Sequence, residues 1–264
     1  MKFLKTTKWL CTALAAILAA APALAADPFA SDWSPSLKSS ARLIAGQNGV
    51  GVEIKLAPGT ITYWRDPGDA GVPPTFDFSG SSNLAKAEPL FPAPSRIEEP
   101  GGVQAFGYQK GVVFPIAVTP RDPASPVKLA LKLNYAACEK ICVPAQATLS
   151  LGLLAQSANS PYDAALDAAR MAVPRAADAA ASGALTALDA KRWRYCLAGT
   201  AARDLFVEPP QGWWIAAKAD AEPGCFALEL KLSPDGAALP VAARLTITGG
   251  DGPLEANVTL AAKP

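Results

Sequence analysis

Short stretches in which apolar and polar residues alternate recur along the chain. The clearest spans 50–56, where Val52 and Ile54 would face one side and Glu53 the other. A period of two is the pattern of a β-strand with one buried face. Similar runs, separated by turn-forming Pro and Gly residues, occur at 61–64, 75–78, 112–119, 127–135 and 147–153. Six or more such strands predict an antiparallel β-sandwich, so the fold class is expected to be all-β.

The chain divides into two strand-rich halves joined by an Ala-rich stretch. Ser160 followed by Pro161 is typical of a helix N-terminus, with a capping residue and then Pro at the first helical position. One short helix is therefore predicted there. Strand-like runs return at 205–208, 213–217, 226–232, 243–248 and 254–261. The predicted organisation is a β-sandwich domain over 27–155, a helix and linker over 156–183, and a second small β-sandwich-like domain over 184–264.

The composition removes several classes of function. The 24 basic residues nearly balance the 23 acidic ones, for a net charge of +1, whereas nucleic-acid binding needs a clustered basic excess. We therefore expect no nucleic-acid partner. The chain contains no His, which excludes Ser-His and Cys-His catalytic arrangements and His-metal sites. We predict neither a cofactor nor a metal.

The amino terminus has the pattern of a targeting segment. Three lysines precede an apolar run, 9–24, that ends in an Ala-Leu-Ala sequence of the kind signal peptidase recognises. The alternative, a retained anchor, is disfavoured because Pro22 breaks the run and a span needs about 20 apolar residues. We predict a signal peptide over 1–25, cleaved near Ala25 or Ala26. The mature protein is expected to be exported, without stable membrane insertion, to an oxidising compartment.

The cysteines supply the candidate chemistry. Cys11 lies within the predicted signal peptide, which leaves Cys138, Cys142, Cys196 and Cys225. Three pairings are possible, and the even division between the two halves favours Cys138 with Cys142 and Cys196 with Cys225. Closing a loop of about 30 residues should stabilise the fold by roughly 3.6 kcal/mol, and closing about five residues by roughly 2 kcal/mol. The second pair is therefore interpreted as a structural disulfide.

The first pair has two possible roles. Alternating strands flank it, so the segment 136–146 is predicted to be the hairpin connection, with both sulfurs near the surface at one end of the sandwich. An accessible disulfide suits thiol–disulfide exchange, which needs an open path to a sulfur. A turn-stapling disulfide fits the spacing equally well. Metal binding by Cys138 and Cys142 is disfavoured because Met171 is the only thioether of the mature chain, so the ligand set is incomplete.

Two motifs resemble a known family. The sequences YAACEKICVP at 135–144 and GTITYWRDPGDAG at 59–71 are similar to the N-terminal domain of the periplasmic thiol:disulfide interchange protein DsbD, and most of all to its ScsB-type relatives with closely spaced cysteines. The resemblance covers about 30–155, roughly half the mature chain. It implies an immunoglobulin-like sandwich in the periplasm. It also implies a cysteine pair that accepts electrons from a membrane-embedded thiol reductase and passes them to periplasmic thioredoxin-fold proteins.

The resemblance also assigns roles to individual residues. Cys142 would form the mixed disulfide with a partner, and Cys138 would resolve it. A loop with an aromatic side chain shields the disulfide in the family, and by position Tyr63 and Trp64 are the candidates. The alternative is that both aromatic residues simply pack in the core, which is the common fate of Trp beside a strand.

The chain departs from the best-known member of the family in two respects. Three residues rather than five separate the two cysteines, so the turn and its reduction potential need not be equal. No further stretch reads as a membrane span or a thioredoxin domain, so we expect a separate protein as electron donor, and both directions of electron flow remain open.

A competing class of function is a binding module. In it, the immunoglobulin-like domain would serve adhesion or assembly, and both disulfides would be structural. Whether the chain is an enzyme depends on the same choice, because only a reactive Cys138–Cys142 pair would make it a protein-disulfide reductase. Reactivity distinguishes the two, because structural disulfides have reduction potentials below about −300 mV and a relay disulfide lies above them.

Overall fold

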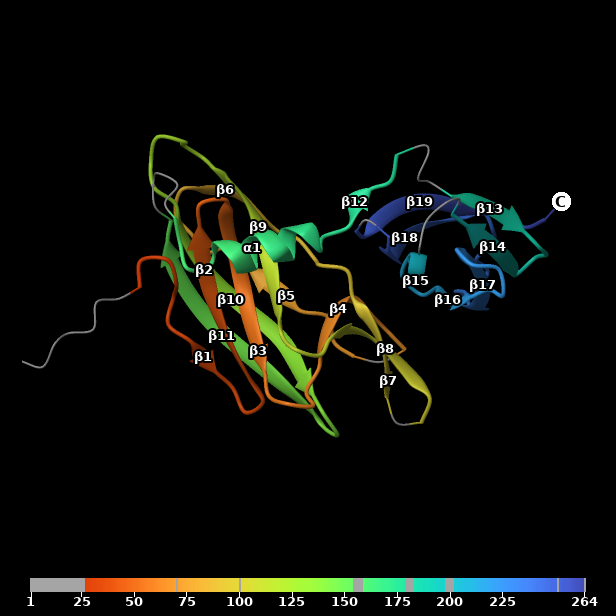
Figure 1. Ribbon diagram of the computed structural model, residues 1–264, viewed down its shortest axis with the longest axis horizontal. Coiled ribbons are helices and arrows are strands. Elements are labelled where there is room, and N and C mark those ends of the chain that lie inside the picture. Colours follow the sequence, from red (N-terminus) through yellow and green to blue (C-terminus); the bar gives the residue numbers. More distant parts are fainter. Residues whose placement is uncertain are drawn as a thin grey trace, which may run out of the picture.

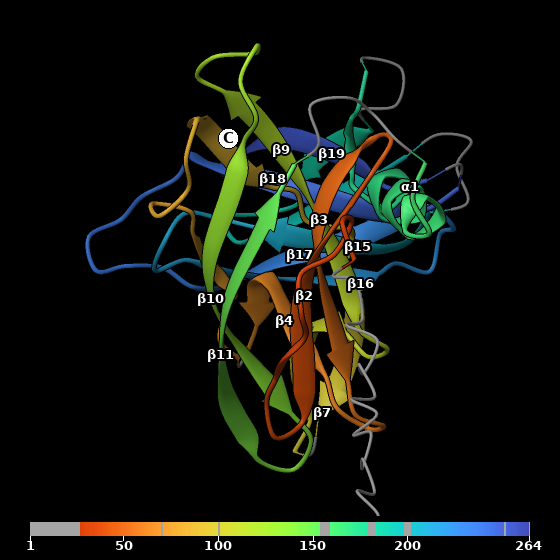
Figure 2. The ribbon, with the colours of Figure 1, turned by 90° about the vertical axis from the view of Figure 1, so that its left-hand side faces the viewer.

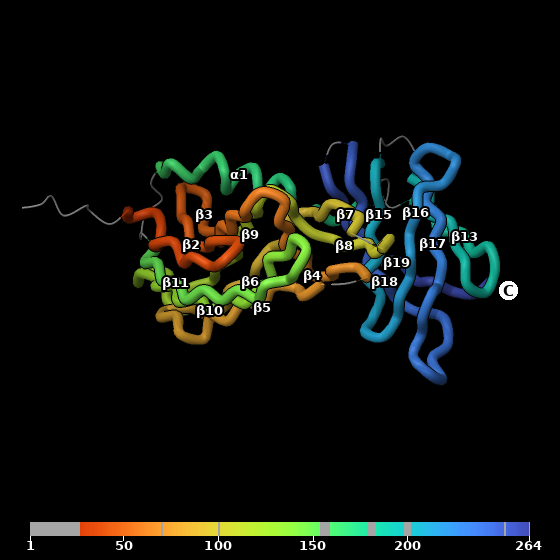
Figure 3. The backbone as a smooth tube through the Cα atoms, turned by 90° about the horizontal axis from the view of Figure 1, so that it is seen from below, coloured from red at the N-terminus to blue at the C-terminus, as the bar shows by residue number. Residues whose placement is uncertain are grey.

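The structure is a computed structural model, and it describes residues 27–69, 71–99, 101–153, 159–178, 183–197, 202–250 and 252–263. The predicted signal peptide lies outside these residues. The described chain consists of β-strands and one short helix, arranged as two units that lie end to end (Figures 1 and 3). The all-β fold class is therefore confirmed. Within the described ranges, no helix is both long and apolar enough to cross a membrane.

The first unit is an antiparallel sandwich of strands β1–β11. A five-stranded sheet in the order β1-β2-β3-β9-β6 faces a three-stranded sheet, β11-β10-β5, and a second three-stranded sheet, β4-β8-β7, lies toward the other unit. Apolar side chains such as Leu43, Val52, Phe114 and Leu131 fill the space between the sheets. The strands are β1 (Ser34–Pro35), β2 (Ser39–Gly46), β3 (Gly49–Leu56), β4 (Thr62–Gly68), β5 (Thr75–Asp77), β6 (Leu84–Pro89), β7 (Ser95–Glu99), β8 (Val103–Tyr108), β9 (Val112–Pro120), β10 (Lys128–Cys138) and β11 (Cys142–Gly152).

The β10–β11 hairpin is longer than the sequence suggests. Its register runs without interruption from Lys128 opposite Gly152 to Cys138 opposite Cys142. The connection is therefore 139–141, and the prediction that 136–146 forms the connection was wrong. The reason is local: Ala136 and its neighbours on β10 are buried on both faces, so the alternation that marks a half-exposed strand disappears there.

The helix α1 (Asp163–Met171) packs on the first unit. It begins two residues later than expected, because Ser160 and Asp163 exchange hydrogen bonds ahead of it. The Ser160 amide donates to the Asp163 carboxylate at 2.8 Å, and the Asp163 amide donates to the Ser160 carbonyl at 3.2 Å. Leu166 is fully buried against the sheet, and Gly46 and Gly51 provide the space for the helix. The helix thus covers the outer face of β2, β3 and β9 (Figure 2).

The second unit is a smaller sandwich of two four-stranded sheets, β12-β19-β18-β15 and β13-β14-β17-β16. Cys196 and Cys225 stand opposite each other on β14 and β17 and form a disulfide. The strands are β12 (Arg175–Ala176), β13 (Ala184–Ala187), β14 (Arg192–Cys196), β15 (Ala202–Glu208), β16 (Trp214–Ala219), β17 (Cys225–Leu232), β18 (Val241–Gly249) and β19 (Leu254–Leu260).

The two units share an apolar and ionic junction. Phe206 of β15 belongs to the core of the first unit, with its ring centroid 5.9 Å from that of Trp64. Arg65 on β4 donates two hydrogen bonds to the Glu208 carboxylate, at 2.7 and 2.8 Å, and a third to Glu255. The Glu208 side chain is only 10% exposed. A charge buried to this extent is stable only when it is paired, so Arg65 is central to the junction.

Replacing Arg65 with Gln should lower the free energy of unfolding by about 1–3 kcal/mol, because it leaves Glu208 with Arg244 as its remaining cationic partner. Urea unfolding followed by Trp fluorescence measures the change. The matched control is Arg192→Gln, whose ion pair with Asp189 is solvent-exposed and should contribute less than about 0.5 kcal/mol. Equal losses from both variants would show that the junction does not depend on this pair.

Candidate functional site

The Cys138–Cys142 disulfide closes the end of the β10–β11 hairpin, and its two halves differ in exposure. The Cα atoms lie 4.0 Å apart. Cys138 is 1% exposed, whereas Cys142 is exposed to solvent. Two backbone hydrogen bonds with Ile61, of 2.8 and 2.9 Å, hold Cys138 on the side away from β11. An incoming thiol can therefore reach Cys142, whereas Cys138 is buried in the protein interior.

The buried sulfur rests on a small apolar cluster that is separate from the main core. Besides Cys138, the cluster comprises Ile61, Tyr63, Ile97, Ala105 and Ala136. These residues come from β4, β7, β8 and β10 and the residue just before β4, so the β4-β8-β7 sheet forms the floor of the site. The cluster makes the environment of Cys138 apolar without burying Cys142.

Tyr63 connects this cluster to the exposed sulfur. Its side chain is 1% exposed, and its hydroxyl lies 3.5 Å from the Cys142 Sγ and 3.5 Å from a carboxylate oxygen of Glu99. Gly71, at φ +127°, passes so close that a Cβ there would lie 2.4 Å from the Tyr63 ring. Only Gly fits this position, and the chain after β4 is therefore packed directly on the ring.

Trp64 lies on the other side of β4, away from the disulfide. It is fully buried in the main core, and its ring meets Phe206 edge to face. Successive side chains of a strand point to opposite faces, so Tyr63 and Trp64 cannot both face the sulfurs. Of the two aromatic residues expected beside the disulfide, Tyr63 contacts it. For Trp64 the expectation was wrong, and its position is that of a core residue.

Burial and a neighbouring carboxylate control the ionisation of Tyr63. Burial, followed by the charge of Glu99 and the hydrogen bond to it, raises the pKa of Tyr63 to about 12. The hydroxyl therefore keeps its proton at neutral pH. A protonated hydroxyl beside Cys142 can donate a hydrogen bond to that sulfur, and such a bond is strongest when the sulfur carries a negative charge.

An ion pair fixes the turn between the two cysteines. Lys38, in the turn between β1 and β2, contacts the Glu139 carboxylate at 2.6 Å. The hydrogen bond from Lys38, followed by its charge, lowers the pKa of Glu139 below its ordinary value. The pair connects two turns that are 101 residues apart in sequence.

Sequence reasoning missed Ile61, Lys38 and Glu99 as parts of this site. Ile61 lies in the 59–71 motif but carries no reactive group, and Lys38 and Glu99 belong to neither motif. Their proximity to the cysteines depends on how the β1–β2 turn, β4 and β7 are arranged in space. The described residues contain no group of three Cys, Asp or Glu side chains placed to hold a metal ion.

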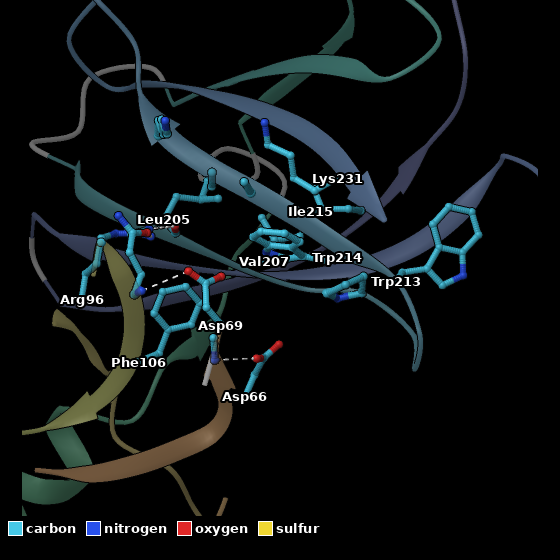
Figure 4. A pocket seen from close by; sticks show the side chains of 17 residues that line it. Asp66, Asp69, Arg96, Phe106, Leu205, Val207, Trp213, Trp214, Ile215 and Lys231 are labelled. Carbon is cyan, nitrogen blue, oxygen red and sulfur yellow. Dashed lines mark hydrogen bonds between the residues drawn. The ribbon is translucent and has the colours of Figure 1, made fainter. Parts of the chain in front are cut away.

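A cavity of about 510 Å³ lies between the two units, at the other end of β4 (Figure 4). Asp66, Phe106 and Arg96 line it from the first unit, and Trp214 and Lys231 from the second. Burial raises the pKa of Asp66 above its ordinary value. Its lining residues in the described part of the chain include no cysteine.

Comparisons with known proteins agree with this geometry. Residues 36–153 match the family described as thiol:disulfide interchange protein DsbD, N-terminal. The crystal structure of the N-terminal periplasmic domain of ScsB from Proteus mirabilis is similar over 90% of this chain and 100% of its own, with a TM-score of 0.68 and 21% sequence identity. The similarity therefore extends over most of both units. Among curated proteins, none matches the chain.

Removing the Tyr63 hydroxyl should destabilise the reduced form of the Cys138–Cys142 pair relative to the disulfide. At pH 9, where thiols are largely ionised, Tyr63→Phe is expected to make the reduction potential of Cys138–Cys142 about 30 mV more negative, since one hydrogen bond to a thiolate is lost. A glutathione redox titration with alkylation and mass mapping measures it. The control is Tyr135→Phe, whose hydroxyl bonds Ser39 instead. An unchanged potential in Tyr63→Phe would mean that the hydroxyl does not stabilise the reduced pair.

The Cys196–Cys225 disulfide should act on stability alone. It links strands in the second unit, and Cys225 is 4% exposed. Replacing both cysteines with Ala should lower the free energy of unfolding by about 3–4 kcal/mol, because the bond closes a loop of about 30 residues. Urea unfolding measures this loss, and the rate of Cys138–Cys142 reduction by dithiothreitol should not change. Slower reduction in a folded variant would show that the two pairs were given the wrong roles.

Proposed function

Since residues 36–153 form a DsbD N-terminal-like domain, we propose that this chain relays electrons in the periplasm through Cys138 and Cys142, from a membrane-embedded thiol reductase to thioredoxin-fold proteins. The domain is a thiol–disulfide interchange module. The unequal exposure of its two sulfurs is the observation that carries the relay proposal, because it supports a different role for each cysteine.

In the first half-reaction the chain is reduced. A thiolate of the donor attacks the exposed Sγ of Cys142, the S–S bond breaks, and Cys138 leaves as a thiolate. The donor's second thiolate then attacks its own sulfur in the mixed disulfide and releases the Cys142 thiolate. Two electrons have passed to the chain, the donor carries the new disulfide, and the two thiolates take up protons according to the pH.

In the second half-reaction the chain reduces an acceptor. The Cys142 thiolate attacks the acceptor disulfide, forms a mixed disulfide and displaces one acceptor thiolate. Cys138, held 4.0 Å away between Cα atoms, then attacks Cys142 Sγ, which restores the intramolecular disulfide and releases the second acceptor thiolate. The burial of Cys138 supports this order, because a buried sulfur meets its neighbour more readily than a second protein.

Tyr63 has two functions in this proposal. Its hydroxyl has one proton, which it donates to Glu99 in the oxidised form and can donate instead to the Cys142 thiolate after reduction. Its ring, covered by the chain at Gly71, closes one side of the sulfur to solvent. The shield is thus a buried side chain of β4 rather than an exposed loop residue. The predicted signal peptide, cleaved near Ala25 or Ala26, would deliver this site to the periplasm.

Cys138→Ser should trap partners. The variant keeps Cys142 but removes the sulfur that resolves its mixed disulfides, so disulfide-linked adducts should accumulate when the reduced protein meets a periplasmic extract or an oxidised thioredoxin-fold protein. Non-reducing electrophoresis with mass identification detects them, and dithiothreitol should release them.

Cys142→Ser is the matched control, because it leaves only the buried Cys138, and it should form few adducts. Equal trapping by both variants, or none by either, would contradict the relay. A wild-type Cys138–Cys142 pair that resists reduction as strongly as Cys196–Cys225 would instead favour a binding module with two structural disulfides.

A further inference from the structure

The cavity between the two units lies where both sheets of the second sandwich end. Strand β15 is the edge of one sheet, and β16 is the edge of the other. Leu205 and Val207 of β15 and Ile215 of β16 belong to the core of the second unit and also border the cavity. Figure 4 shows Asp69 and Phe106 of the first unit on the opposite wall. The cavity therefore separates the first unit from two strand edges of the second.

The edge of β16, rather than one of its faces, borders the cavity. All six residues from Trp213 to Lys218 contribute to the lining. Successive side chains of a strand point to opposite faces, so an unbroken run of lining residues means that the backbone itself faces the cavity. Among the described residues, the backbone of 214–218 has hydrogen-bond partners on β17 alone. This edge thus presents unpaired N–H and C=O groups to the cavity.

The neighbouring edge of β15 is already occupied in part. Arg96 of β7 donates a hydrogen bond to the Leu205 carbonyl at 3.0 Å. The same guanidinium pairs with Asp204, the residue before Leu205, at 2.9 Å. These contacts hold the first unit against β15. A strand that enters the cavity therefore meets an available backbone edge at β16.

Two carboxylates of the first unit border the cavity without a cationic partner. Asp66 accepts a hydrogen bond from the Gly68 amide at 3.1 Å, and Asp69 accepts one from the Gln104 amide at 3.0 Å. Each bond uses one carboxylate oxygen, and neither aspartate forms an ion pair with another described residue. A cation placed beside them would compensate both charges.

The basic side chains of the lining do not supply that cation. Arg96 is paired with Asp204, and Lys231 is paired with Glu229 at 2.6 Å. Lys218 is exposed, so water and salt screen its charge. The first-unit wall of the cavity therefore keeps an uncompensated negative charge, and a ligand with a basic group complements it.

We propose that the cavity holds an extended peptide segment that adds a strand to the free edge of β16 and places a basic side chain beside Asp66 and Asp69. This inference goes beyond the proposed electron relay and does not depend on it. A free backbone edge favours an extended chain, because another strand offers matching N–H and C=O groups along its whole length. Trp214, which is 46% exposed, provides an apolar contact for the flanking side chains. The ligand class is a polypeptide segment with Lys or Arg between apolar residues.

Two pentapeptides with blocked ends, Thr-Val-Lys-Val-Thr and Thr-Val-Glu-Val-Thr, test the site on the purified full chain. Amide chemical shifts in nuclear magnetic resonance spectra report binding. The lysine peptide should bind with a Kd of roughly 0.1–1 mM, and the glutamate peptide about tenfold more weakly, because its charge repels the two aspartates. At saturation with the lysine peptide, amides within 214–218 should exchange with deuterium about tenfold more slowly, because the added strand protects them.

The double variant Asp66→Asn, Asp69→Asn should bind the two peptides within about twofold of each other, because the charge that distinguishes them is gone. Asn can still accept the hydrogen bonds from Gly68 and Gln104, so the local fold is kept. The matched control is Asp32→Asn with Asp235→Asn, which removes two exposed carboxylates outside the cavity lining and should keep the preference for lysine.

Three results would overturn the inference. A lysine peptide that produces no saturable shift at about 10 mM, well above the expected Kd, would exclude the site. Equal binding of both peptides by the wild-type chain would exclude the role of the acidic pair. Saturable binding without slower exchange within 214–218 would exclude strand addition to β16.

Discussion

The backbone pairing of Ile61 with Cys138 is the constraint on which the site depends. Strand β10 is bonded to β11 on one side, and at its end Cys138 exchanges two backbone hydrogen bonds with Ile61 on the other. Cys138 is thereby fixed inside the protein. Cys142, opposite it at the start of β11, lies on an edge strand of the sheet formed by the described strands and is exposed. One disulfide thus joins an interior strand to an edge strand, and its two sulfurs meet different environments.

Strand β4 contacts the disulfide near its beginning and the second unit further along. At its beginning, Tyr63 contacts the exposed sulfur, and further along Arg65 pairs with Glu208 and Glu255 of the second unit. Trp64, between them, packs on Phe206. The second unit contributes no atom to the site, but it covers the part of β4 that would otherwise be open. Its contacts with β4 are made by Arg65 and Trp64, the two residues that follow Tyr63.

The sequence identified what depends on local pattern and missed what depends on three-dimensional arrangement. Alternating residues predicted the β-sandwich and the strands that flank the cysteines. The motifs at 59–71 and 135–144 indicated the resemblance to the DsbD N-terminal family, whose model matches residues 36–153. The hairpin was placed wrongly because Ala136 to Cys138 are buried on both faces and show no period. Glu99 and Lys38 were missed because they reach the disulfide from β7 and from the β1–β2 turn, which no spacing along the chain brings together.

The two disulfides have similar backbone geometry and different surroundings, and the surroundings are the basis for proposing a different role for each. Both join directly opposed residues of antiparallel strands, with Cα separations of 4.0 and 4.1 Å. Cys196 ends β14 and Cys225 begins β17, both interior strands of their sheet, and Cys225 is 4% exposed. Cys142 begins the edge strand β11, is exposed to solvent, and has the Tyr63 hydroxyl 3.5 Å from its Sγ. Exchange needs access and a stabilised thiolate, and the exposure of Cys142 beside a hydroxyl is the reason to propose that role for the first disulfide.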